Sequence, residues 1–212
     1  MNNMNIAVIA ANGRSGQAFV EAATTAGHIV RGGVRRQPGA FKHANLEYIS
    51  CDATKSEDVG QLIRGCDIVV SLVGHVRGST ATVQSDAMHI AIAAMHAEGV
   101  ARIISLTGTG VRVAGDDITL IDRILTTAVG LIDPKRIADG RMHVEVLKSS
   151  DLDWTVLRVL KLTNGQDSSF KLTEHGPTKT FVSRADVSQA LLQIVEQGGY
   201  SKALPMISKS SS

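Results

Sequence analysis

Short apolar segments alternate with amphipathic segments along most of this chain, and this alternation limits the possible folds more than any other sequence feature. Residues 4–11 form an apolar run that ends in a glycine-containing turn, which predicts a buried strand, and apolar residues within 15–26 follow helical spacing. The same patterns predict strands at 28–34, 46–51, 67–73, 101–106 and 154–158, and helices at 56–65, 80–98 and 134–149. Such alternation is typical of an α/β fold with a Rossmann-type doubly wound parallel sheet. Right-handed crossovers place the C-terminal ends of the strands at one edge, where we expect the ligand.

The amino-acid composition supports a single domain with an aliphatic core. The chain has 212 residues, of which 43% are hydrophobic and 3% aromatic, so aliphatic side chains must fill the core. We expect a single domain over residues 1–209 and a disordered tail at 210–212. After residue 159 the alternation weakens. Short strands at 170–172 and 180–182 predict a small C-terminal cap over about 160–182, and a last helix begins near Ser183.

The charge and the cysteines exclude several classes of partner and location. A net charge of +2 is too small to predict a nucleic-acid or membrane partner. Cys51 and Cys66 lack metal or redox spacing, so we interpret them as reduced core residues. His89 and His96 could share one face of a helix, but no nearby acid or cysteine completes a metal site with them. No run of 18 apolar residues occurs, and the N-terminus lacks a signal pattern. We expect a cytoplasmic protein, as a monomer or small homo-oligomer.

A glycine-containing loop follows the first predicted strand. Residues 10–16 read AANGRSG, and they join this strand to the start of a helix. Free N–H groups and the positive end of a helix make such a turn a site for anions, and Gly13 and Gly16 suit a pyrophosphate and close helix packing. With two glycines of the usual three, the bare pattern also fits a tight turn without a ligand. The strand before it and the helix after it favour dinucleotide binding.

The residues at the end of the second predicted strand select the cofactor. Sites for NAD usually place a carboxylate on the adenosine ribose about 20 residues after the loop, yet no acid occurs between Glu21 and Glu47. Arg35 and Arg36 stand there instead, and Arg14 in the loop adds a third guanidinium group. Guanidinium groups bind a 2′-phosphate through charge-assisted bonds, although two surface arginines are also compatible with plain solvation. The sequence predicts NADP(H) in preference to NAD(H).

Several stretches of the chain together resemble one family. Residues 10–16 look like its G-A-x-G-x-x-G loop, although Ala10 replaces the first glycine, which tolerates positive φ far better. Residues 34–36 (VRR) are similar to its V-R cofactor signature and residues 51–53 (CDA) to its G-D-x segment. The most specific stretch runs from residue 141 to 158 and includes DLDWTVLR, and SRADV at 183–187 resembles a family helix start. On these motifs, residues 5–196 resemble the NAD(P)H-binding, NmrA-like branch of atypical short-chain dehydrogenase/reductases, which includes biliverdin reductase B-type flavin reductases.

This resemblance implies a dinucleotide that lies along the strand ends. It puts the phosphates on the loop at 10–16, the 2′-phosphate on the paired arginines, and adenine beside residues 52–53. Residues 72–74 would line the ribose and pyrophosphate, and the nicotinamide would lie beside Thr107 with residues 159–162 beneath it. The implied cofactor-binding residues are Ala10, Asn12, Gly13, Arg14, Ser15, Gly16, Arg35, Arg36, Asp52, Ala53, Leu72, Val73, Gly74, Thr107, Val159, Leu160, Lys161 and Leu162.

The catalytic positions depart from those of better-known short-chain reductases, which use Tyr-x-x-x-Lys. Aligning Glu145 with the glutamate common after that motif puts Ile137 at the tyrosine position and Arg141 at the lysine position. Thr107, Arg141 and Lys161 are the candidate catalytic residues, although a solvated arginine or lysine is an equal alternative for the last two. We interpret His143 as a structural histidine. The apolar segment 111–131 is expected to form a lid or a substrate wall.

These features favour an NADPH-dependent oxidoreductase that reduces a small conjugated acceptor, such as a flavin or quinone, by direct hydride transfer. Without an evident acid, we expect no side-chain proton donor to be essential, since a conjugated acceptor can take hydride before a proton. Two alternatives stay open. A non-enzymatic NADP(H) sensor or regulator of the NmrA type would bind the cofactor without turnover, and a sugar-nucleotide epimerase or dehydratase is disfavoured by the missing tyrosine. A G-x-S-x-G hydrolase motif is absent.

Overall fold

The computed structural model describes residues 3–36, 40–165, 169–178 and 181–210. One sheet in this part has the strand order β3-β2-β1-β4-β5-β6-β10-β8. Its strands are β1 (Asn5–Ile9), β2 (Ile29–Val34), β3 (Leu46–Ser50), β4 (Ile68–Ser71), β5 (Arg102–Gly108), β6 (Asp153–Val159), β8 (Phe170–Thr173) and β10 (Met206–Lys209). All neighbours pair in parallel except β8 and β10. The chain order reverses between β1 and β4, so the predicted doubly wound parallel sheet is confirmed.

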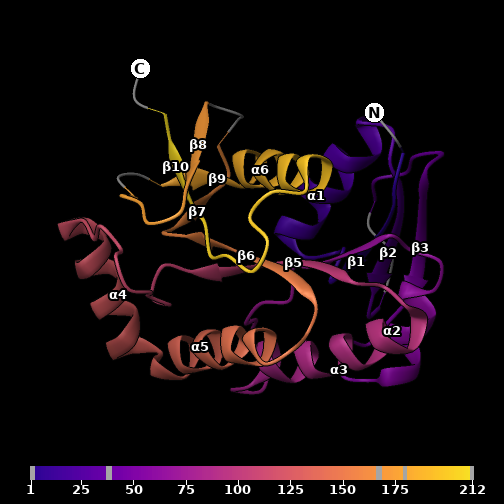
Figure 1. Cartoon of the computed structure of the whole chain (residues 1–212), viewed down its shortest axis with the longest axis horizontal. Helices are drawn as coiled ribbons and strands as arrows, with labels where there is room; N and C mark the ends of the chain where they lie inside the picture. The colour runs from indigo at the N-terminus through magenta and orange to yellow at the C-terminus, as the bar shows by residue number, and fades with distance from the viewer. Residues whose placement is uncertain (1–2, 37–39, 166–168, 179–180, 211–212) are drawn as a thin grey trace.

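Helices cover both faces of the sheet, as Figure 1 shows. On one face, α1 (Arg14–Thr25) packs against α6 (Arg184–Gln197). On the other face, α3 (Val83–Glu98) lies between α2 (Ser56–Ile63) and α5 (Pro134–Lys148). Each layer buries its own aliphatic cluster against the sheet, because strands covered on both faces alternate their side chains between two cores. The sheet edge between these layers stays open to a ligand.

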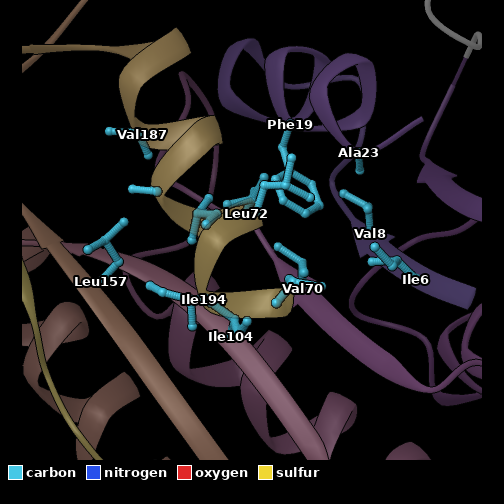
Figure 2. Packing of buried hydrophobic residues seen from close by; sticks show 14 of the residues in the cluster. Ile6, Val8, Phe19, Ala23, Val70, Leu72, Ile104, Leu157, Val187 and Ile194 are labelled. Atoms are coloured by element: carbon cyan, nitrogen blue, oxygen red, sulfur yellow. The ribbon is translucent and has the colours of Figure 1, made fainter. Parts of the chain in front are cut away.

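The core beneath α1 and α6 is built from residues that the sequence pattern already marks as apolar. Phe19 and Ala23 of α1 meet Val187 and Ile194 of α6 above the sheet (Figure 2). Val8, Val70, Ile104 and Leu157 rise from four adjacent strands to complete this cluster (Figure 2). Tight aliphatic packing of this kind fixes the start of α1 relative to the strand ends. The glycine-containing turn before α1 is therefore held on a rigid support.

The C-terminal part differs from the predicted cap in one respect. β8 pairs with β10, a strand that the sequence patterns did not predict, and so extends the main sheet. The short strands β7 (Leu162–Thr163) and β9 (Val182–Ser183) form a separate pair. Thr180 of the predicted strand lies outside the described residues. Of the predicted tail, Ser210 donates its backbone N–H to the Ser169 carbonyl, and residues 211–212 lie outside the described part.

Segment 111–131, predicted as a lid or wall, contains most of α4 (Leu120–Ile132). Figure 1 shows α4 at the end of the molecule opposite β3. Asp122 is its buried residue, whereas Leu131 and Ile132 are more than four-fifths exposed. Cys51 and Cys66 are free and buried, as expected. Within the described ranges, every helix is too short or too polar to traverse a bilayer.

Candidate functional site

A cavity of about 900 Å³ lies at the C-terminal ends of the parallel strands, where the sequence places the ligand. The segments that follow β1, β2, β3, β4, β5 and β6 all contribute to its wall. Helices α4 and α5 close one end of it. Since parallel strands end at a common edge, residues that lie far apart along the chain meet here.

Most of the predicted site residues line this cavity. Of the implied cofactor-binding residues, all except Gly16 belong to the wall, and of the catalytic candidates Thr107 and Lys161 do. Arg141 is exposed on α5 and lies outside the wall, whereas Ile137 and Gly140 of the same helix line it. The placement of Arg141 at a catalytic position is therefore not supported by the orientation of α5. The roles of the other residues stay predictions.

The loop at 10–16 presents backbone donors to the cavity. Gly13 is the N-cap of α1 and offers no side-chain acceptor, and the first turn contains no acid. The early N–H groups of α1 are therefore available to an anion at the positive end of the helix. Gly16 lies behind the loop, where a Cβ atom would come within 2.3 Å of the Ala10 carbonyl oxygen. Its missing side chain lets α1 pack directly against the end of β1.

Ala10 carries the left-handed conformation that the family gives to a glycine. Its φ is +63°, whereas Gly13 has an ordinary φ of −67°. A left-handed backbone costs a non-glycine residue about 1–2 kcal/mol, because the Cβ atom approaches the carbonyl oxygen. The loop therefore keeps its turn at the expense of local strain.

Replacing Ala10 with glycine is expected to raise the free energy of unfolding by about 0.5–1 kcal/mol. Relief of the left-handed strain exceeds the extra backbone entropy that glycine loses on folding. Urea denaturation measures the change, and Ala18→Gly within α1 is the control, expected to cost about 1 kcal/mol. Destabilisation by both substitutions would contradict strain at Ala10.

Positive charge dominates the wall of the cavity. Among the described lining residues, the cationic ones are Arg14, Arg35, Arg36, Arg136, Lys161 and Arg184, and the acidic one is Asp52. Burial and the nearby charge of Arg14 lower the pKa of Arg184, which donates to the Thr163 carbonyl and to the Asn164 side chain. This excess of cations over acids in the wall favours an anionic ligand.

Asp52 lies at the end of the cavity beside Arg35. Its Oδ1 accepts hydrogen bonds from the Thr54 backbone N–H at 3.1 Å and the Thr54 hydroxyl at 2.8 Å. These bonds, together with the charges of Arg35 and Lys55, hold the pKa of Asp52 below its ordinary value. The carboxylate is thus engaged by its own turn, and it leaves Arg36 and part of the charge of Arg35 for a ligand.

The opposite end of the cavity is apolar. Side chains from α4 and α5 line it, namely Leu125, Ala128, Val129, Ile132 and Ile137, together with Val111 from the preceding loop. The predicted substrate wall at 111–131 therefore does border the cavity. This combination of a cationic end and an apolar end suits a ligand set with phosphates at one side and a flat hydrophobic group at the other.

His143 lies behind the wall and outside the cavity. It is 2% exposed, and its Nε2 lies 3.0 Å from the Ser105 hydroxyl. Burial lowers the pKa of His143 to about 4, and the charge of Asp139 opposes this shift in part. The interpretation of His143 as a structural histidine agrees with this position.

Lowering the pH is expected to reduce the free energy of unfolding, because His143 is buried in its neutral form. The folded pKa of about 4 lies below the unfolded value of about 6.5, so the unfolded state binds the proton first. The contribution of neutral His143 to the free energy of unfolding is therefore complete above about pH 6.5. It falls by about 3 kcal/mol as the pH is lowered toward 4. Urea denaturation at several pH values should show that His143→Gln loses less stability over this range than the wild type. Parallel pH profiles would contradict the assignment.

Three polar residues near the cavity were missed by the sequence analysis. His75 and Gln84 belong to its wall, and Asp139 is buried beside them, with Oδ2 at 2.8 Å from Nε2 of His75. His75 follows the predicted Val73-Gly74 pair directly, which was the one available signal. Asp139 carried no signal, because its partners come from distant parts of the chain.

Comparison with known proteins agrees with this architecture. The chain is similar to a short-chain dehydrogenase/reductase from Veillonella parvula DSM 2008 in complex with NADP, with a TM-score of 0.82, 17% identity, and coverage of 99% of this chain and 96% of the other. It is also similar to a Streptococcus pneumoniae TIGR4 protein provisionally described as an NADH-flavin reductase. The TM-score is 0.79 and the identity 21%, with coverage of 98% of this chain and 100% of the other. A Bacillus halodurans protein provisionally described as an NAD-dependent epimerase/dehydratase has a TM-score of 0.79 and 17% identity, with coverage of 99% of this chain and 96% of the other. At these identities the likeness establishes the fold.

The family itself follows from the sequence match. A search of curated proteins finds no match. The model of a family described as NAD(P)H-binding matches residues 10–198, which include the glycine loop, the paired arginines and the start of α6. This range is most of the chain and agrees with the resemblance recognised from the motifs. The chain therefore belongs to the NAD(P)H-binding family.

Proposed function

We propose that this protein is an NADPH-dependent reductase that transfers hydride directly to a flavin, a quinone or a similar conjugated acceptor. The observation that carries this proposal is the excess of cationic over acidic residues in the described wall of the cavity, six against one. When bound, NADPH would supply the hydride. The residues of this chain would bind its phosphates, orient its nicotinamide and hold the acceptor against it, which is catalysis by proximity.

The cavity fits the phosphates of NADPH. The N–H groups at the start of α1 face a turn without a side-chain cap, and Arg14 and Arg184 stand beside them. Arg35 and Arg36 follow β2, where the 2′-position of the adenosine ribose is bound in this fold. Arginine forms paired, charge-assisted bonds to phosphate, and these bonds are shorter and stronger than neutral ones.

The apolar end of the cavity supports a conjugated acceptor. Ile137 occupies the wall at the position where other short-chain reductases carry tyrosine, so that general acid is missing. A simple ketone would develop a localised alkoxide and would lose the roughly 10²–10⁴-fold contribution of such an acid. A flavin or quinone spreads the incoming charge over its rings. Both also suit a wall of leucine, isoleucine and valine side chains.

Arg35→Ala is expected to weaken NADPH binding by about 10- to 100-fold and to leave NADH binding nearly unchanged. One or two charge-assisted bonds to the 2′-phosphate, each of roughly 1.5–3 kcal/mol, account for this range. Fluorescence titration with both cofactors measures the ratio. Arg64→Ala removes an exposed arginine outside the cavity and is the control for net charge. An equal loss for both cofactors would show that Arg35 does not bind the 2′-phosphate.

An oxidation assay tests the enzymatic part of the proposal. NADPH and NADH are compared with FMN, FAD, quinones and dyes as acceptors. Rapid oxidation of NADPH by a flavin or quinone is the expected result. Tight binding of both the oxidised and the reduced cofactor without turnover on any acceptor would overturn the proposal in favour of an NADP(H) sensor.

A further inference from the structure

His75 is placed on the cavity wall by the turn that follows β4. Its side chain is 10% exposed, and Nε2 lies 2.8 Å from Oδ2 of Asp139. This pair is close enough for an ion contact, but Nε2 makes no aligned hydrogen bond within the described ranges. Nδ1 bonds to no side chain or backbone group in the described ranges. This nitrogen is the part of His75 left for a ligand.

Asp139 is a rigid support for this histidine. Its side chain is fully buried and lies outside the cavity wall. Oδ2 accepts the Gln84 backbone N–H at 2.9 Å, and Oδ1 accepts both the backbone N–H and the hydroxyl of Ser85, at 3.0 and 2.6 Å. Asp139 thus caps the start of α3 from a neighbouring helix. Three donors hold the carboxylate in place, so the ring of His75 has a fixed partner behind it.

His75 follows β4, next to the lining residues 72–74. The arginines after β2 mark the adenosine side and the start of α1 marks the pyrophosphate. The second nucleoside must therefore extend toward β4 and β5. Gln84 joins the ends of these two strands, because its Nε2 donates to the carbonyls of Val73 and Leu106.

A second contact links His75 to the same region. Gly140 follows Asp139 on α5, and a Cβ atom at Gly140 would lie 2.9 Å from the Thr107 hydroxyl oxygen. Asp139 therefore lies one residue from the contact with Thr107 and directly against His75. His75 and Thr107 both line the cavity, and successive residues of α5 contact them.

We propose that His75 contacts the acceptor and donates the proton that accompanies the hydride, with Asp139 as its positioning residue. The inference rests on the proposed reductase function. The acceptor gains a hydride as the C4–H bond of the reduced nicotinamide breaks, and it gains a proton from Nδ1 of the His75 imidazolium. NADPH is oxidised to NADP⁺, the acceptor is reduced by two electrons, and neutral His75 recovers its proton from water. The sequence-based expectation that no side-chain acid is essential is the alternative, and the variant below distinguishes the two.

His75→Gln tests the proposal, with His143→Gln as the matched control. Glutamine keeps an N–H group that can reach Asp139 but cannot carry a transferable proton, whereas His143 is buried outside the cavity. With FMN and menadione as acceptors, we expect His75→Gln to lower kcat by about 100-fold or more with little change in the Kd for NADPH. His143→Gln is expected to stay within tenfold of the wild-type kcat.

A spectroscopic measurement tests the contact without turnover. In protein with ¹⁵N-labelled histidine, NADP⁺ together with FMN should shift the Nδ1 resonance of His75 and leave that of His143 in place. Asp139→Asn should change the tautomer of His75 and lower kcat less than His75→Gln does. The spectrum also decides the case in which His75→Gln fails to fold, because it uses the wild-type chain.

The possible results separate this inference from the reductase proposal. A kcat of His75→Gln within threefold of the wild type, or an unchanged Nδ1 resonance on ligand addition, would overturn the role of His75 while turnover by the wild type still supports the reductase. Wild-type protein that binds NADP⁺ and shifts Nδ1 but reduces no acceptor would overturn the reductase and, with it, proton donation.

Discussion

Arg158→Met is expected to lower the free energy of unfolding by about 3–5 kcal/mol, the range for removing one partner of a buried ion pair. The Arg158 side chain is fully buried, and its two terminal nitrogens lie 2.5 and 2.9 Å from the two carboxylate oxygens of Asp116. It also donates to the backbone carbonyls of Val111, Glu174 and Leu204. Methionine would leave the Asp116 carboxylate buried without its cation. Urea denaturation gives the change in free energy.

Two further variants identify the cause of this loss. The double variant Arg158→Met with Asp116→Leu should be more stable than Arg158→Met alone, because it removes the unpaired charge. Arg64→Met breaks an exposed pair with Glu98 and should cost less than about 1 kcal/mol. A loss below about 1 kcal/mol in Arg158→Met would show that the buried pair contributes little beyond its own desolvation.

Gly16→Ala is expected to destabilise the protein by about 3 kcal/mol or more and to weaken the binding of both cofactors. The added Cβ would lie 2.3 Å from the carbonyl oxygen of Ala10 and 2.7 Å from that of Ala11, and both neighbours are backbone atoms that cannot rotate away. Relief requires α1 to move off the end of β1. The N–H groups at the start of α1, which we propose bind the phosphates, would move with it. Denaturation and fluorescence titration measure the two effects.

Gly60→Ala is the control for this substitution. Gly60 lies within α2, and a Cβ atom there would meet nothing within 4 Å. Alanine at this position should stabilise the protein by about 0.5–1 kcal/mol through helix propensity. Equal tolerance of alanine at both positions would contradict the close approach of α1 to the strand end.

Local sequence patterns predicted the strands and helices and the positions of the glycine loop and the paired arginines. Apolar runs and a spacing of 3.6 residues indicate which segments are buried, so strands β1 to β6 and most helices could be predicted within a few residues of their ends. The glycine loop and the paired arginines follow two consecutive strands, and a parallel sheet brings such positions to one edge in any order of the later strands. Ala10 likewise could be expected to be strained, because the loop needs a positive φ wherever it occurs.

Contacts between distant segments decided the rest. β10 is four residues long and becomes recognisable through its pairing with β8. Arg141 is exposed to solvent because α5 presents Ile137 and Gly140 to the cavity. His75 and Asp139 belong to different βα units, and their 2.8 Å contact depends on how α5 packs beside the start of α3. Periodicity records which face of a segment is buried, but the partner of a buried polar group is set by the packing of whole elements. The sequence by itself thus determined the sheet and the edge at which the glycine loop and the paired arginines lie, and tertiary packing alone decided which other side chains face the cavity.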